Sequence, residues 1–178
     1  MNMRHEFIMS GFGGQGVLLM GQILTYAGML EEKNVSWIPA YGPEMRGGTA
    51  NCSVIIADGP TGSPIVGQPS AVVVLNLPSL DKFMPMVRPQ GVLIVNSSLI
   101  DKAVEREDIR TYRVPVNDLA AGLGNPKMAN MVALGALIAA TGAVRMDTLF
   151  MAFAKKFAAK PQVIELNKVA IQKGFDCI

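Results

Sequence analysis

Apolar positions recur along this chain at two spacings that alternate from segment to segment. Some runs are continuously apolar or alternate with a period of two, as β-strands do; they span residues 4–10, 35–40, 49–57, 71–75, 91–96 and 111–116. Other segments have apolar residues every three to four positions, as helices do; they span residues 15–31, 78–86, 118–123, 128–142, 147–158 and 162–173. Strands that alternate with helices predict an α/β fold with a mostly parallel sheet and right-handed crossovers.

The order of these segments refines the predicted fold. No strand is expected after residue 116, so the last third of the chain is predicted to be helical and to cover the sheet. Residues 58–64 are rich in turn formers, and Ile65 and Val66 are expected to pair back on the strand 49–57 as a β-hairpin. Because neither a repeat nor a linker is visible, residues 1–178 are predicted to form one domain with a Rossmann-like, mostly parallel sheet flanked by helices.

Composition and charge narrow the function classes. The chain has 178 residues, of which 50% are hydrophobic and 17% are charged, an apolar balance that leaves surface for a partner. A net charge of +2 is too small to predict nucleic-acid binding. The longest apolar stretch, residues 131–144, is shorter than the roughly 20 residues that cross a bilayer. Since residues 1–10 do not resemble a signal peptide, we expect a cytoplasmic protein that binds neither nucleic acid nor membrane.

The stretch from Ser10 to Val17 carries the strongest chemical signal. Its glycines match the pattern G-x-G-x-x-G between a predicted strand and a predicted helix, which is the setting in which this pattern binds phosphate. Backbone N–H groups at the start of a helix are unpaired and partially positive, and glycines let an anion reach them. We predict that this turn binds a phosphate group; the candidate residues are Gly11, Phe12, Gly13, Gly14, Gln15, Gly16 and Val17.

The identity of the phosphate is constrained by what surrounds this turn. A dinucleotide site needs an acidic residue at the end of the second strand, but residues 39–41 are Pro-Ala-Tyr, and Glu31 and Glu32 come too early. A P-loop needs Lys-Ser or Lys-Thr after the glycines, and neither is present. Two interpretations stay open: the turn binds the phosphate of a ligand other than NAD, which we favour, or it only packs a helix against a strand.

A second loop, residues 41–48, follows the second predicted strand. Because the carboxyl ends of neighbouring strands in an open α/β sheet share one crevice, we expect this loop beside the glycine turn. Arg46 can clamp a phosphate through two hydrogen bonds, or it can pair with Glu44 on a bent loop, and the sequence leaves both open. The candidate binding residues in this loop are Tyr41, Glu44, Arg46, Gly47 and Gly48.

The side chains that independent catalysis needs are missing. His5 is the only histidine and is expected at the surface of a frayed N-terminus, so no Ser/His/Asp set can form. Both cysteines lie outside any CxxC motif, which argues against a disulfide framework and against a zinc or iron–sulfur site. Cys52 is expected in the core, and Cys177 is expected to be exposed without a neighbour that activates it. We predict no catalytic residue and no metal site in this chain.

The two glycine loops together resemble the gamma subunit of 2-oxoacid:ferredoxin oxidoreductases, in the pyruvate/ketoisovalerate oxidoreductase family. The resemblance rests on residues 11–16 and 41–49, and it continues through residues 73–76, 91–98 and 130–136, so that it covers nearly the whole chain. It implies a place in an assembly that oxidatively decarboxylates a 2-oxoacid, transfers electrons to ferredoxin and loads the acyl group on coenzyme A.

The resemblance also implies a division of labour between chains. Coenzyme A is expected at the glycine turn of this chain. In related single-chain pyruvate enzymes the second loop has a lysine pair where this chain has Glu44-Met45, which leaves Arg46 as the cation of that loop. Thiamine diphosphate, Mg²⁺ and iron–sulfur clusters are expected in partner chains, namely alpha and beta subunits and, in some assemblies, a ferredoxin-like delta subunit. A homodimer is an option for the isolated chain.

The identity of the 2-oxoacid stays open, and so do two alternative functions. The form of residues 41–48 is most similar to the 2-oxoglutarate and branched-chain enzymes, and we favour 2-oxoglutarate. The same glycine turn also suits a free-standing Rossmann-type nucleotide-binding regulatory module, or an interaction protein in which the turn is structural. Stabilisation of the chain by coenzyme A but not by NAD would favour the enzyme subunit over the free-standing module.

Overall fold

The computed structural model describes residues 3–41 and 49–178, and these residues form an α/β fold around a six-stranded sheet with the strand order β2-β3-β1-β4-β5-β6. The strands are β1 (Arg4–Phe12), β2 (Asn34–Tyr41), β3 (Thr49–Ala57), β4 (Ala71–Val74), β5 (Val92–Asn96) and β6 (Arg110–Val114). Strands β1, β4, β5 and β6 are parallel, whereas β3 is antiparallel to both of its neighbours. The prediction of a mixed, mostly parallel sheet is confirmed.

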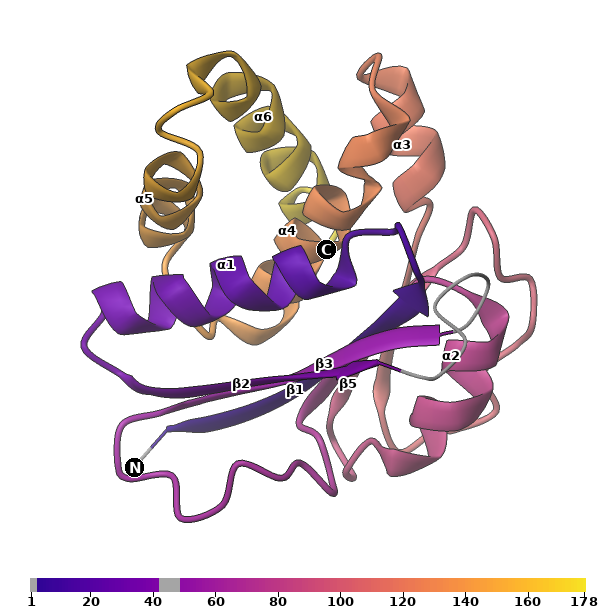
Figure 1. The fold of residues 1–178 in the computed structure, drawn as a ribbon. Helices are drawn as coiled ribbons and strands as arrows, with labels where there is room; N and C mark the ends of the chain where they lie inside the picture. The colour runs from indigo at the N-terminus through magenta and orange to yellow at the C-terminus, as the bar shows by residue number, and fades with distance from the viewer. Residues whose placement is uncertain (1–2, 42–48) are drawn as a thin grey trace.

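Helices cover both faces of the sheet (Figure 1). They are α1 (Val17–Leu30), α2 (Leu77–Phe83), η1 (Met84–Met86), α3 (Val116–Gly122), η2 (Pro126–Met128), α4 (Ala129–Thr141), α5 (Met146–Lys156), η3 (Pro161–Val163) and α6 (Ile164–Phe175). One apolar core joins α1 and the helices after β6 to one face, and a second core joins α2 to the other face. The helical C-terminal third is therefore confirmed as a cover on the sheet.

Helix α4 is the centre of the larger core. Nearly all of its side chains are buried, because the sheet lies on one side of it and α6 on another. Gly135 of α4 faces the backbone of Ile171, and Gly174 of α6 faces the backbone of Val132. A Cβ at either glycine would overlap with a carbonyl oxygen of the other helix. The two helices can thus pack with their backbones in contact only because these positions lack side chains.

A β-hairpin is present as predicted, but its predicted position at residues 65 and 66 is wrong, for a physical reason. Residues 65 and 66 form no strand; Val66 is buried in the smaller core, and Ile65 is 78% exposed. The antiparallel hairpin is instead β2–β3, connected through the loop 42–48. Strand β3 pairs with β2 on one edge and with β1 on the other, so neither edge is left for a further strand.

Candidate functional site

The sheet has a topological switch point between β1 and β4. These two strands are parallel neighbours, but β1 continues through α1 to β2 on one side of it, whereas β4 continues through α2 to β5 on the other side. Helices α1 and α2 lie on opposite faces of the sheet. A crevice opens outside the carboxyl ends of two strands that diverge in this way, and ligands of open α/β folds bind there. The predicted glycine turn follows β1 directly and lies at this edge.

The glycine turn is closed by hydrogen bonds at its base. The N–H of Gln15 donates to the carbonyl of Phe12 (3.1 Å), and the N–H of Phe12 donates to the side-chain Oε1 of Gln15 (2.6 Å). A Cβ on Gly11 would meet that same Oε1 and the Cβ of Leu75. Gly14 has a φ of +93°, and among the described residues beyond its chain neighbours no heavy atom lies within 4 Å of the position of its Cβ. The turn is therefore braced at its base and open at Gly14.

Helix α1 begins at this turn with backbone N–H groups that have no acceptor within the helix. Its N-cap is Gly16, in the left-handed region (φ 75°, ψ 23°), and no side chain caps the helix. Its first backbone bond runs from the N–H of Met20 to the carbonyl of Gly16 (3.1 Å), so the preceding helical N–H groups have no intrahelical acceptor. The first turn of α1 also contains no acidic residue. These features favour an anion at this end of the helix, although the role of residues 11–17 in binding stays a prediction.

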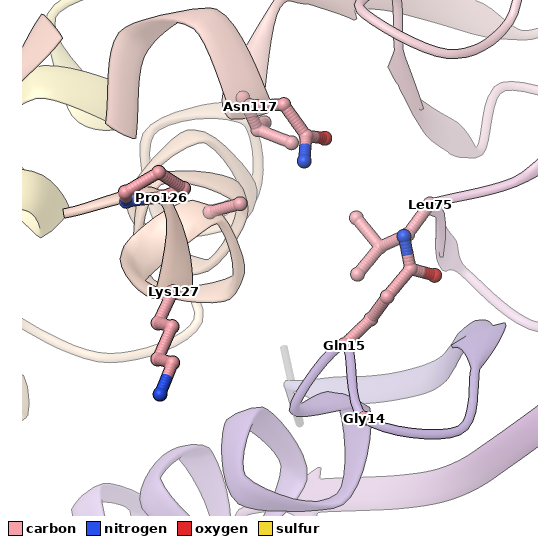
Figure 2. A pocket seen from close by; sticks show the side chains of 8 residues that line it. Gly14, Gln15, Leu75, Asn117, Pro126 and Lys127 are labelled. Atoms are coloured by element: carbon pink, nitrogen blue, oxygen red, sulfur yellow. The ribbon is translucent and has the colours of Figure 1, made fainter. Parts of the chain in front are cut away.

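A cleft lies between the glycine turn and the start of α4. Its volume is about 240 Å³, and the residues that line it are Gly14, Gln15, Leu75, Val116, Asn117, Pro126, Lys127 and Ala129. Figure 2 shows Asn117, Pro126 and Lys127 across the cleft from Gln15 and Leu75. Lys127 is the one charged side chain among these lining residues, and it is exposed. Sequence reasoning missed Lys127 and Asn117 as site residues, although it predicted a helix that starts at residue 128.

The walls of the cleft are held by buried asparagines. The Asn96 side-chain amide donates to the carbonyl of Leu75 (3.1 Å) and to Oδ1 of Asn117 (2.7 Å), which joins the ends of β4 and β5 to α3. Asn130 lies in α4 and donates from Nδ2 to the carbonyl of Gly16 (3.2 Å). The segment with Asn130 carried the family resemblance, but its contact with the glycine turn could not be read from the sequence.

Asn125 caps the short helix η2, which comes just before the position of the predicted helix 128–142. Its Oδ1 accepts from the N–H of Lys127 (3.1 Å) at the start of η2, and the α-helix proper begins only at Ala129. The predicted helix start at residue 128 is therefore one residue early. The effect of the Asn125 cap is to fix the backbone at Lys127.

The second loop begins and ends beside the glycine turn. Tyr41 of β2 pairs with Ala50 of β3, Ala50 pairs with Gly11, and Thr49 pairs with Phe12. The ends of this loop lie near the glycine turn because β3 is between β1 and β2 and pairs with both. The expectation that the first two strands are themselves neighbours is wrong. Four predicted site residues of this loop lie outside the described residues, and their roles stay predictions; they are Glu44, Arg46, Gly47 and Gly48.

The groups considered for catalysis lie away from the cleft or are buried. His5 is half-buried within β1 and stacked on Phe7, so its expected place at a frayed surface is wrong. Burial, assisted by the charge of Arg88, lowers the pKa of His5. Cys52 is buried as predicted, and burial raises the pKa of its thiol to about 12. Cys177 is exposed, also as predicted.

The described residues carry neither a metal-binding cluster nor a membrane-spanning helix. Within residues 3–41 and 49–178, no cluster of His, Cys, Asp and Glu side chains is suited to hold a metal ion. In the same part of the chain, no helix combines the length and apolarity that crossing a bilayer requires.

These features define a class: a Rossmann-like α/β domain with an open glycine turn at the switch point of its sheet. Residues 6–177 match the protein family described as pyruvate ferredoxin/flavodoxin oxidoreductase, and the chain belongs to this family.

Curated relatives of two lengths are similar to the chain. The 2-oxoglutarate synthase subunit KorC of Methanocaldococcus jannaschii is 35% identical, over 98% of this chain and 94% of the relative. The ketoisovalerate oxidoreductase subunit VorA of Methanothermobacter marburgensis is 38% identical over 94% of this chain, but the chain spans only 35% of that relative. The VorA relatives are thus about three times as long as the match, while KorC has nearly the same extent.

Solved structures have the same fold. The gamma subunit of keto/oxoacid ferredoxin oxidoreductase from Geobacter sulfurreducens superposes with a TM-score of 0.82 at 34% identity, over 97% of both chains. The chain therefore has the extent and fold of a gamma subunit of this family. A 2-oxoglutarate:ferredoxin oxidoreductase from Magnetococcus marinus, with 2-oxoglutarate, coenzyme A and succinyl-CoA bound, gives a TM-score of 0.90 at 21% identity over 31% of its length, which shows the fold alone.

Proposed function

We propose that the chain is the gamma subunit of a heteromeric 2-oxoacid:ferredoxin oxidoreductase of the cytoplasm. The complex would convert a 2-oxoacid and coenzyme A to the acyl-CoA and carbon dioxide, and the two electrons released would reduce ferredoxin. The proposal is supported by the match to KorC over 94% of its length and to a gamma subunit over 97% of its length. Alpha and beta subunits, with a delta subunit in some assemblies, are the proposed partners; they would hold the thiamine diphosphate, Mg²⁺ and iron–sulfur clusters.

The proposed role of this chain is to bind the diphosphate of coenzyme A at the glycine turn, residues 11–17. The observation that carries this proposal is the start of α1 at Gly16, where no described side chain caps the helix and the first N–H groups have no intrahelical acceptor. The turn is open at Gly14 toward the described part of the chain, since none of its heavy atoms beyond the adjacent residues lies within 4 Å of the Cβ position. None of the described residues that line the adjoining cleft has a carboxylate that would repel an anion. Coenzyme A supplies the thiol that accepts the acyl group, and this chain would orient it.

The second loop is proposed to contribute to the same site. Tyr41 and Thr49, which flank this loop, belong to strands whose ends lie beside Gly11 and Phe12. A guanidinium from Arg46 would add a two-pronged contact to a phosphate. Tyr41, Glu44, Gly47 and Gly48 would shape the loop around the ligand.

For the 2-oxoacid we propose 2-oxoglutarate, with ketoisovalerate as the alternative. KorC, named for 2-oxoglutarate synthase, matches the chain from end to end. VorA, named for ketoisovalerate, is slightly more identical but spans a longer protein. Because no residue in the described cleft is charged other than Lys127, the choice of acid is expected to depend on the partner subunits.

Two measurements test this function. The chain is tagged and purified with its native neighbours, and ferredoxin reduction is followed with 2-oxoglutarate, ketoisovalerate and pyruvate in turn. In parallel, the melting temperature of the purified chain is recorded with coenzyme A and with NAD. We expect coenzyme A-dependent ferredoxin reduction by the complex, none by the chain alone, and a rise in melting temperature with coenzyme A only. Stabilisation by NAD alone, or oxidation of a 2-oxoacid by the isolated chain, would overturn the proposal.

A further inference from the structure

The described residues give the cleft beside the glycine turn a positive charge. Among the described residues that line it, Lys127 is the only charged one, and Gln15 and Asn117 are polar and uncharged. Among the residues that the structure describes, no carboxylate forms an ion pair with Lys127. Asp118, the nearest acid in sequence to Asn117, is engaged by the Ser98 hydroxyl at 2.9 Å. A second hollow on the molecule, by contrast, contains Glu31, Glu32 and Lys33. The cleft is therefore suited to a negatively charged group.

The size of the cleft indicates how much of a ligand it holds. Sites that enclose a whole drug-sized ligand usually measure roughly 300–1,000 Å³. The cleft measures about 240 Å³, so it can take one part of a molecule as large as coenzyme A. Leu75, Val116 and Ala129 give it an apolar lining, and its cation, Lys127, is exposed. An anionic group joined to a less polar ring system fits this arrangement.

The backbone that carries the cation is held in place by a neighbouring side chain. The N–H of Lys127 is bound by Oδ1 of Asn125, which fixes the backbone of η2. Across the cleft, Gln15 is tied to the N–H of Phe12. Figure 2 shows Lys127 and Gln15 on opposite sides of the cleft, so the ammonium group and the backbone donors of the glycine turn come from different elements. Two separated donor sets match a ligand with two separated phosphates.

Coenzyme A has such a pair: a 5′-diphosphate and a 3′-phosphate on the same ribose. We propose that Lys127 binds the 3′-phosphate and thereby selects coenzyme A over 3′-dephospho-coenzyme A. This inference rests on the proposed function, in which the diphosphate binds at residues 11–17. Lys127 is thus a specificity-determining residue, which acts on the affinity for the co-substrate and not on the chemistry of the 2-oxoacid.

The test compares the two co-substrates in the complex purified with its native partners. Ferredoxin reduction is measured at saturating 2-oxoacid with coenzyme A and with 3′-dephospho-coenzyme A, for the wild type, Lys127→Met and Lys127→Arg. Lys155→Met is the matched control, because Lys155 is exposed on α5 and does not line the cleft. A charge-assisted hydrogen bond contributes about 1.5–3 kcal/mol, so Lys127→Met should lower kcat/KM for coenzyme A about tenfold to a hundredfold.

The pattern across co-substrates decides the outcome. The proposal expects kcat/KM for 3′-dephospho-coenzyme A to be the same in the wild type and Lys127→Met, Lys127→Arg to recover most of the loss, and Lys155→Met to match the wild type. Equal losses with both co-substrates, or no loss with either, would overturn it. If the wild-type complex used neither co-substrate, the proposed function would fail instead, so the two failures are distinguishable. Melting temperatures of the variants separate misfolding from lost binding.

Discussion

The side-chain amide of Asn130 donates a hydrogen bond to the carbonyl oxygen of Gly16 at 3.2 Å, across 114 residues of sequence. Asn130 is 5% exposed, and its Oδ1 is bound in turn by the N–H of Met131 at 3.0 Å. The bond ties the start of α4 to the N-cap of α1. It also explains why residue 16 is a glycine, because a Cβ there would overlap with the Asn130 amide.

Gly16→Ala and Asn130→Ala are therefore expected to be coupled. Gly16→Ala alone has two costs: an alanine at a φ of 75° is strained, and its Cβ overlaps with the Asn130 amide. In the Asn130→Ala background the overlap is gone, and only the backbone strain of roughly 1–2 kcal/mol remains. The double variant should then lose at least about 0.5 kcal/mol less free energy of unfolding than the sum of the losses of the two single variants. Urea unfolding of the four proteins measures this. Additive free energies of unfolding would show that the contact has no energetic weight.

Gly13→Val tests the glycine turn as a phosphate site. Gly13 is exposed, so a branched side chain should leave folding nearly intact while it obstructs the approach to the turn. We expect a loss of at least about tenfold in kcat/KM for coenzyme A, with a change in melting temperature of a few degrees at most.

The control for this variant is Gly67→Val, at an exposed glycine with no heavy atom within 4 Å of its Cβ position. It should affect neither folding nor coenzyme A. Full coenzyme A turnover in the Gly13→Val complex would reject the assignment of the turn.

Arg46→Ala tests the second loop. If the guanidinium of Arg46 binds a phosphate, its loss should raise KM for coenzyme A about tenfold and leave KM for the 2-oxoacid nearly unchanged. Arg110→Ala is the control, since Arg110 is exposed at the amino end of β6, the end away from the cleft. Equal rises of the two KM values would mark the loop as a structural element.

The strands and the glycine turn could be predicted from the sequence because their signals are local. Residues 71–74 are apolar throughout, as a parallel strand with helices on both faces must be, and they form β4. The pairing of β3 was not local. The turn formers after Ala57 indicated a hairpin with residues 65 and 66, but β3 was already paired on both edges, with β1 and β2.

The cleft was missed for the same physical reason. Gln15 and Lys127 line the cleft from two segments that are far apart in the chain. They face each other across it only because α4 packs on the same face of the sheet as α1. Periodicity predicts each helix but does not say which residues at two helix starts face each other. The Asn130–Gly16 bond is of this kind too: both residues lie in segments that carried the family resemblance, yet the contact exists only in the folded chain.

The two cysteines should differ sharply in reactivity. Only the thiolate is nucleophilic, and burial raises the pKa of Cys52 to about 12, while Cys177 is exposed. Iodoacetamide at about pH 8 should therefore modify Cys177 and spare Cys52 in the folded protein, as read by mass spectrometry of peptides. Labelling of both at one rate would contradict the buried position of Cys52.

The same pKa predicts a fall of stability in alkali. The unfolded thiol ionises near its ordinary pKa of 9.0, whereas the folded thiol stays protonated up to about 12. Stabilisation from this group is complete below the unfolded pKa and is lost as the pH rises toward the folded one. The free energy of unfolding should drop more steeply between about pH 9 and pH 12 in the wild type than in Cys52→Ala. Parallel curves would exclude this contribution.

The contact between α4 and α6 gives the largest expected loss of stability. A Cβ on Gly135 would overlap with the carbonyl oxygen of Ile171, and one on Gly174 with that of Val132. Backbone atoms cannot swing aside as a side chain can, so Gly135→Ala and Gly174→Ala must separate the two helices. We expect each to lower the free energy of unfolding by about 3 kcal/mol, the upper part of the range for overpacking.

Gly122→Ala is the matched control for these two variants. Gly122 ends α3, and no heavy atom lies within 4 Å of its Cβ position, so the change should be neutral or stabilise by up to about 1 kcal/mol through helix propensity. Because the separation of α4 from α6 would also shift Asn130, the Gly135→Ala protein should lose affinity for coenzyme A together with stability. A variant at residue 135 as stable as the wild type would show that the helices are not packed backbone to backbone.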